Sequence, residues 1–145
     1  MRAVAALSFG AACLHGSVIV SHFREYVLFG LFFAIVAPLQ VLWAELLRRA
    51  PEQRRLLAAG AIGNGLVVVV WLVTRTVGLP FGPERLEAEA AGLKDVLATG
   101  SELMLVALAA VLLGRAGRSL PGWAVVTAWA LASLGLVAAL VGGGH

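Results

Sequence analysis

Two pairs of ionisable residues lie seven positions apart within stretches that are otherwise apolar. His15 and His22 form one pair, and Asp95 and Glu102 form the other. Seven residues span about two helical turns, so the members of each pair share a helix face and lie about 10 Å apart. Imidazole and carboxylate side chains together bind zinc, iron, manganese or copper. Ionisable groups are costly inside a bilayer, and for this reason they usually mark a site with a partner nearby.

The composition indicates that these residues do lie in a bilayer. The chain has 145 residues, of which 61% are hydrophobic and 13% charged, and its mean hydropathy is +0.95. A soluble domain is about half apolar and about a quarter charged. The net charge of +3 falls at segment ends and not in a patch interleaved with aromatic residues, so we expect no nucleic-acid partner. The single cysteine, Cys13, excludes an intrachain disulfide and a multi-thiolate metal site.

The hydropathy pattern predicts an all-α integral membrane bundle that forms one domain over residues 1–145. About 20 apolar residues suffice to cross a bilayer as a helix, and a helix satisfies its own backbone hydrogen bonds there. Five such stretches are present. The predicted spans are Ala3–Phe23, Tyr26–Leu47, Leu56–Leu79, Leu93–Leu113 and Trp123–Val141.

The arginines predict the orientation of the bundle. Four of them lie between the second and third spans, Arg115 and Arg118 follow the fourth span, and Arg2 precedes the first. In a five-helix chain these positions share one side, which the positive-inside rule makes cytoplasmic. We therefore expect the N-terminus inside and the C-terminus outside, in a bacterial inner (plasma) membrane.

The segment between the third and fourth spans is rich in proline, glycine and glutamate. Pro83 suits the first turn of a helix, glutamates suit its positive end, and Gly92 could end it. This pattern predicts a short interfacial helix from Pro83 to Ala91 over the outer mouth of the bundle. A solvated acidic loop is the alternative.

The predicted topology places the two pairs at matching depths. The first span runs outward and the fourth runs inward, so His22 is level with Asp95 and His15 with Glu102. We therefore expect an outward-facing metal site, with zinc as the first candidate and copper or iron as the next. The expected ligands are His15, His22, Glu25, Asp95 and Glu102, and Arg75, Tyr26, Glu84 and Glu87 are expected to support them.

Each of these residues also has a structural explanation when it is taken alone. His15 could be a packing histidine, Asp95 a carboxylate at a helix start, and Glu102 a protonated group bonded to Thr99 or to a neighbouring helix. Arg75 could extend to the lipid headgroups. The match in depth and in charge across the set favours a site.

A second polar set lies deeper, on the second and third spans. Gln40 and Asn64 have similar depths, and Glu45 lies near the cytoplasmic edge. Amide side chains often link helices inside bilayers, which makes a packing role the first interpretation. The alternative joins this inner set to the outer one as a single proton or ion path. Trp71, toward the end of its span, is interpreted as an interfacial anchor.

Residues 15–105 resemble a group of small, uncharacterised bacterial membrane proteins found mainly in actinobacteria. The resemblance rests on His22-x-x-Glu25 followed by residues 30–33 (GLFF) and Gln40, on the run from Trp71 to Pro83, and on Asp95 to Thr99 with Glu102. It implies a compact multi-helix bundle and brings no activity with it.

Three classes of function fit these expectations. The site could be a metalloenzyme with an open coordination position, or a structural metal-binding subunit. The same polar residues could instead serve a transporter or a conductor of protons or ions. The lipid bilayer is the expected partner, and a homo-oligomer is compatible with so small a bundle.

Overall fold

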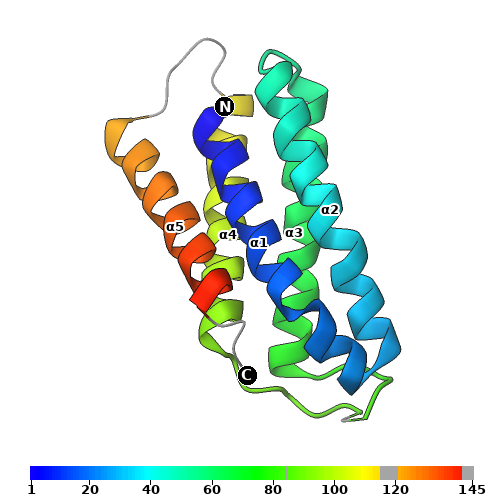
Figure 1. The fold of residues 1–145 in the computed structure, drawn as a ribbon. Helices are drawn as coiled ribbons and strands as arrows, with labels where there is room; N and C mark the ends of the chain where they lie inside the picture. The colour runs from blue at the N-terminus through cyan, green and yellow to red at the C-terminus, as the bar shows by residue number, and fades with distance from the viewer. Residues whose placement is uncertain (84, 115–120, 142–145) are drawn as a thin grey trace.

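The five predicted helices are confirmed by the structure, a computed structural model that describes residues 1–83, 85–114 and 121–141. Each helix is long and apolar enough to cross a membrane. They run side by side (Figure 1). The helices are α1 (Arg2–Glu25), α2 (Val27–Arg49), α3 (Arg54–Thr76), α4 (Leu93–Gly114) and α5 (Gly122–Val141).

The first helix, α1, is the centre of the bundle. It packs against α2, α4 and α5, whereas α3 packs mainly against α4 and only lightly against α2 (Figure 1). Tyr26 alone separates α1 from α2, because its extended backbone (φ −159°, ψ 132°) interrupts the helical path. Gly30, near the start of α2, has no side chain, and this makes room for the ring of Phe23. A Cβ on Gly30 would lie 2.2 Å from that ring. The chain can therefore reverse here within one residue.

The end of the bundle that holds the N-terminus has a solid apolar core. The first turns of α1 and α3 meet the last turns of α2 and α4 there, and α5 adds Ala124 and Ala128. Five of the large side chains at this level are at most 1% exposed. We call them the apolar plug: Val4, Leu7, Leu47, Leu57 and Leu105.

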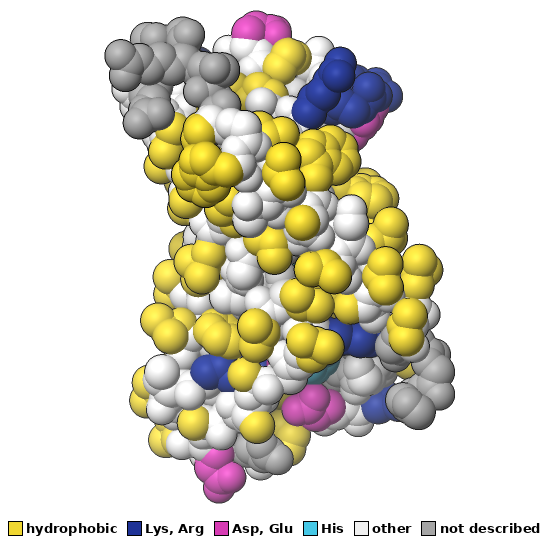
Figure 2. Space-filling model, turned by 90° about the vertical axis from the view of Figure 1, so that its left-hand side faces the viewer, with side chains coloured by type: hydrophobic (Ala, Val, Ile, Leu, Met, Phe, Trp, Pro, Cys, Tyr) yellow, Lys and Arg dark blue, Asp and Glu magenta, His cyan; other side chains and the backbone are white. Residues whose placement is uncertain are grey.

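The surface of the bundle is apolar between its two ends. One face shows hydrophobic side chains over its middle, with charged side chains gathered toward the ends (Figure 2). Large apolar residues such as Val126 and Leu134 are 70% and 54% exposed. Such a surface is stable in lipid, where exposed hydrocarbon carries no penalty.

The predicted interfacial helix is not confirmed in the described part of the α3–α4 connection. Residue 83 and residues 85–91 form bends, a turn and irregular chain. The amide of Leu86 donates to the carbonyl of Leu79, and that of Glu89 donates back to Thr74 of α3. Gly82 (φ 101°) and Leu86 (φ 59°) have left-handed backbones, which interrupt a right-handed helix. The segment is thus an acidic loop that folds back toward α3.

Candidate functional site

Gln40 of α2 connects polar side chains from three other helices in the middle of the bundle. Its Oε1 lies 3.0 Å from His15 Nδ1, and its Nε2 donates to Asn64 Oδ1 at 2.9 Å and to Glu102 Oε1 at 2.7 Å. The four residues are between 1% and 6% exposed. We call this set, one residue from each of α1 to α4, the buried polar network: His15, Gln40, Asn64 and Glu102.

The bonds of Gln40 fix where hydrogens lie in the network. Its Oε1 can only accept, so His15 carries hydrogen on Nδ1, and the Nε2 of a neutral imidazole keeps its lone pair. That Nε2 lies 3.9 Å from Glu102 Oε1. Glu102 Oε1 accepts from Gln40, whereas Glu102 Oε2 has no hydrogen-bond partner among the described residues. An added proton can therefore be held at His15 Nε2 or at Glu102 Oε2.

Backbone groups hold the network in place from two sides. Asn64 Nδ2 donates to the carbonyl of Gly60 one turn earlier, at 2.8 Å, and this leaves its Oδ1 facing Gln40. The hydroxyl of Ser8 donates to the main-chain carbonyl of Gln40 at 3.1 Å, joining α1 to α2. Buried polar groups with satisfied partners are rigid, because any rearrangement would leave one of them unpaired.

A cluster of ion pairs lies at the end of the bundle opposite the N-terminus. Arg75 pairs with Glu89, and its Nη2 donates to Asp95 Oδ2 at 2.9 Å. Asp95 Oδ2 also accepts the amide of Gly92 at the start of α4. Arg75 thus balances the charge of Asp95. Its other partner is Glu89, whereas Glu87 is exposed and Glu84 lies outside the described residues.

His22 and Glu25 form a separate pair at the end of α1. Their Nδ1 and Oε2 atoms are 3.1 Å apart. The ring of His22 stacks on Phe33 at 4.6 Å between centroids, and the ring of Tyr26 packs against Phe29 at 5.2 Å. No contact between His22 and Asp95 is among the hydrogen bonds and ion pairs of the described residues, although the predicted depths match.

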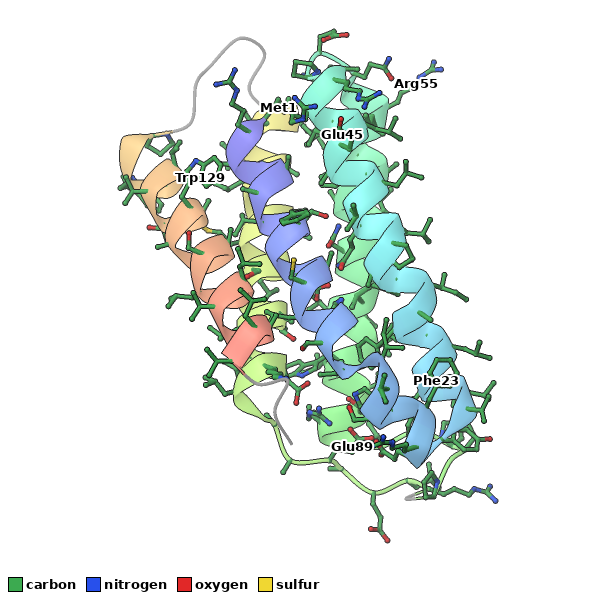
Figure 3. The ribbon with its side chains drawn as sticks, viewed as in Figure 1. Met1, Phe23, Glu45, Arg55, Glu89 and Trp129 are labelled. Carbon is green, nitrogen blue, oxygen red and sulfur yellow. The ribbon has the colours of Figure 1, made fainter. Side chains whose placement is uncertain are left out.

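A cavity of about 310 Å³ lies between α1, α2, α3 and α4 in the half of the bundle beyond the apolar plug. His15, Thr99 and Glu102 line its deep end, and Arg75, Glu89 and Asp95 line its outer end, where the latter two stay partly exposed. In Figure 3, Glu89 and Phe23 mark this end of the bundle, while Met1, Glu45 and Arg55 mark the other. Between the two ends the wall is aromatic and apolar: Val18, His22, Phe29, Phe33, Val70 and Trp71. The cavity thus leads from the charged end to the buried polar network.

The five predicted metal ligands fall into three places. His15 meets Glu102, His22 meets Glu25, and Asp95 meets Arg75. Within residues 1–83, 85–114 and 121–141, no group of three or more histidine, cysteine, aspartate or glutamate side chains could hold a metal ion. A site that uses all five residues stays a prediction.

The structure brings into the site residues for which the sequence indicated a structural role. Gln40 and Asn64 belong to the same network as His15 and Glu102, and Glu45 alone is separate, paired with Arg48 at the other end of the bundle. The sequence feature that indicated a contact between Gln40 and Asn64 was the similar depth of these two amide side chains on adjacent spans. Trp71 lines the cavity, and nothing in its position at the end of a span distinguishes it from an interfacial anchor.

No protein-family model, curated protein sequence or solved structure matches the chain. The resemblance of residues 15–105 to a group of small bacterial membrane proteins therefore stays a prediction.

Proposed function

We propose that the protein is a proton-linked transporter of the bacterial inner membrane, in which the buried polar network takes up a proton from the cavity. The observation that carries this proposal is the pair formed by His15 and Glu102. The two side chains are 6% and 1% exposed, lie 3.9 Å apart and line the deep end of the cavity. Ionisable groups held inside a membrane-spanning bundle are typical of proton relays.

Among the described residues this pair is reached from one end of the bundle, which favours a transporter over an open channel. The cavity leads from the network to one end of the bundle, and the apolar plug closes the other end. A proton held at Glu102 can leave through the plug only if the helices move apart, which is the requirement of alternating access. The light contact between α2 and α3 offers one place where such a movement would break few contacts.

The orientation in the membrane follows from the charges at the two ends. Arg48, Arg49, Arg54 and Arg55 lie at the plug end, together with Arg2. The positive-inside rule assigns this end to the cytoplasm, so the cavity would open outward. Protons would then enter from the side on which an energised bacterial membrane holds the higher proton concentration.

The proposal is tested by measuring charge movement after a pH jump. Proteoliposomes adsorbed on a solid-supported membrane give a transient current when a proton enters or leaves a buried site. We expect a pH-dependent transient for the wild type and its loss in Glu102→Gln, because an amide keeps the bond from Gln40 but cannot ionise. Glu25→Gln, which changes an exposed carboxylate in the same way, should keep the transient.

A wild-type protein without a transient, or a transient of equal size in Glu102→Gln, would overturn the proposal. The melting temperature of each variant, measured in the same lipid, separates loss of the proton site from loss of the fold.

A further inference from the structure

A groove of about 880 Å³ runs along the surface of the bundle at the end that holds the apolar plug. It lies between α2 and α5, and α1 forms its floor. Both α2 and α5 pack on α1, but they do not pack on each other, so the groove stays open between them. In Figure 3, Trp129 of α5 and Glu45 of α2 lie on either side of α1.

Each of these three helices lines the groove with four residues at positions i, i+3, i+4 and i+7. The first residues of the three sets are Arg2, Val41 and Trp129. This spacing covers one face of a helix over two turns, or about 10 Å. We call the hollow between the three faces the plug-end groove. Several of its side chains are small and leave it open. They are Ala5, Ala6, Ala44 and Ala132.

One end of the plug-end groove is positively charged. Arg2 is the first residue of α1, and Arg48 is the last but one of α2. Glu45 pairs with both Arg48 and Arg49, so these three side chains together keep one positive charge. Arg2 takes part in none of the ion pairs found among the described residues, and it adds a second positive charge. This end of the groove therefore suits an anion.

The pairing of Arg48 leaves room for a phosphate group. Its Nε and Nη2 donate to the carboxylate of Glu45 at 2.7 and 2.8 Å. A guanidinium has five N–H donors, so three of them stay available. The side chain is 61% exposed. Because the planar guanidinium matches the geometry of phosphate oxygens, Arg48 can hold Glu45 and a phosphate at the same time.

The order of charge and hydrocarbon along the groove matches that of a phospholipid. The arginines lie at the end of the bundle, at the level of lipid headgroups, and the alanines follow over two helical turns. The hydrocarbon of one leaflet is about 15 Å deep, so an acyl chain is long enough to lie along the whole groove. Basic pockets between membrane-spanning helices are typical binding sites for anionic lipids.

A helix from a second copy of the chain is the other occupant that such small side chains would admit. Copies in one membrane have the same orientation. A second copy would therefore bring the arginines of its own α1, α2 and α3 to the level of Arg2 and Arg48. Like charges that face each other oppose such a contact, whereas a phosphate neutralises them. The charge of the groove favours the lipid.

We infer that the plug-end groove binds an anionic phospholipid. Its phosphate lies between Arg2 and Arg48, and an acyl chain lies against the alanines of the groove. In the proposed orientation this lipid belongs to the cytoplasmic leaflet. The inference goes beyond the proposed function and does not depend on it, since no residue of the buried polar network lines this groove.

The headgroup contact is tested by native mass spectrometry of the protein in detergent. The probes are palmitoyl-oleoyl phosphatidylglycerol, which is anionic, and phosphatidylcholine with the same chains, which has no net charge. We expect the wild type to prefer phosphatidylglycerol. Arg2→Gln and Arg48→Gln should each weaken its binding about fivefold, as the loss of one arginine near the headgroups predicts. In Arg48→Gln the carboxylate of Glu45 keeps its pair with Arg49.

The control for these variants is Arg55→Gln. It changes an exposed arginine at the same end of the bundle but outside the groove, so it should leave the binding of phosphatidylglycerol unchanged. Equal affinities of the wild type for the two lipids would overturn the inference. Equal weakening by all three substitutions would also overturn it, because it would indicate a general attraction to the charged end.

A second pair of variants tests whether an acyl chain lies in the groove. Ala6→Phe fills the groove and should weaken the binding of phosphatidylglycerol several-fold. Ala107→Phe makes the same change at an exposed position of α4 outside the groove, and it should have no effect. Glycerol phosphate, which has the phosphate but no chains, should not displace the lipid at equal concentration. Wild-type binding by Ala6→Phe, or displacement by glycerol phosphate, would overturn the inference.

The same spectra report the oligomeric state. A dimer that binds no phosphatidylglycerol and dissociates in Ala6→Phe would identify a second copy as the occupant and would overturn the lipid site. The melting temperature of each variant separates loss of the lipid from loss of the fold. If Ala6→Phe does not fold, the arginine variants decide.

Discussion

At the scale of residues, the site depends on the two-sided chemistry of an amide. Gln40 accepts from His15 through Oε1 and donates to Glu102 through Nε2, so one side chain links a base to an acid that lie on different helices. It also donates to Asn64. A leucine at this position would fill similar space but would leave all three partners without the bond that Gln40 supplies.

Gln40→Leu should therefore destabilise the bundle. Removing one partner of a buried hydrogen bond leaves the other unsatisfied, and together these losses amount to about 2 kcal/mol of unfolding free energy. Reversible unfolding in mixed detergent micelles measures this quantity. Gln53→Leu, in the exposed α2–α3 loop, should change it by less than about 0.5 kcal/mol. Equal effects of the two substitutions would show that the network contributes no stability.

Helical rise made part of this site predictable from the sequence. Depth along a helix follows from residue number, so the sequence placed His15 level with Glu102, and the structure has the two side chains 3.9 Å apart. Depth does not fix the rotation of a helix about its axis or the side-chain rotamer. His22 meets Glu25 on its own helix instead of Asp95, and depth alone could not decide between these two carboxylates.

At the scale of elements, the hydropathy of the chain predicts the helices but not how they touch. The five spans follow from apolar length, a local property, and their bounds agree with the structure to within a few residues. The loop between α3 and α4 is held by long-range bonds, such as that from the amide of Glu89 to the carbonyl of Thr74, and the predicted helix is not confirmed in its described residues. Glu89 reaches Arg75 by this route.

The contact between α1 and α5 gives a prediction at this scale. A Cβ on Gly10 would lie 2.9 Å from the Cα of Ala132, whereas a Cβ on Gly16, in the same helix, would meet nothing within 4 Å. Small residues permit such close approach of helices in lipid. Both Gly→Ala changes raise helix propensity by the same amount, so the difference between their free energies of unfolding isolates the contact between α1 and α5.

Gly10→Ala should be less stable than Gly16→Ala by about 1–3 kcal/mol, because backbone atoms of α5 must move away. The same unfolding measurement checks this difference. If the two variants prove equally stable, α5 does not pack on α1 at Gly10.

At the scale of the whole molecule, polarity is distributed unequally between the two halves of the bundle. The plug half is sealed by aliphatic side chains and is ringed by arginines at its end. The other half holds a cavity that joins an ion-paired outer end to a buried acid and a buried base. Composition and charge predicted which end carries the arginines, but the cavity could not be predicted, because it depends on how four helices diverge. This arrangement supports the proposed proton uptake from one side.

The most direct test of that claim is infrared difference spectroscopy of the protein in lipid during a pH change. A buried carboxyl group that exchanges a proton gives a C=O stretching band that loses intensity as the pH rises. We predict such a band in the wild type and in Asp95→Asn, and its absence in Glu102→Gln. A band that is unchanged in Glu102→Gln, or a wild-type protein without one, would contradict proton binding at the buried polar network.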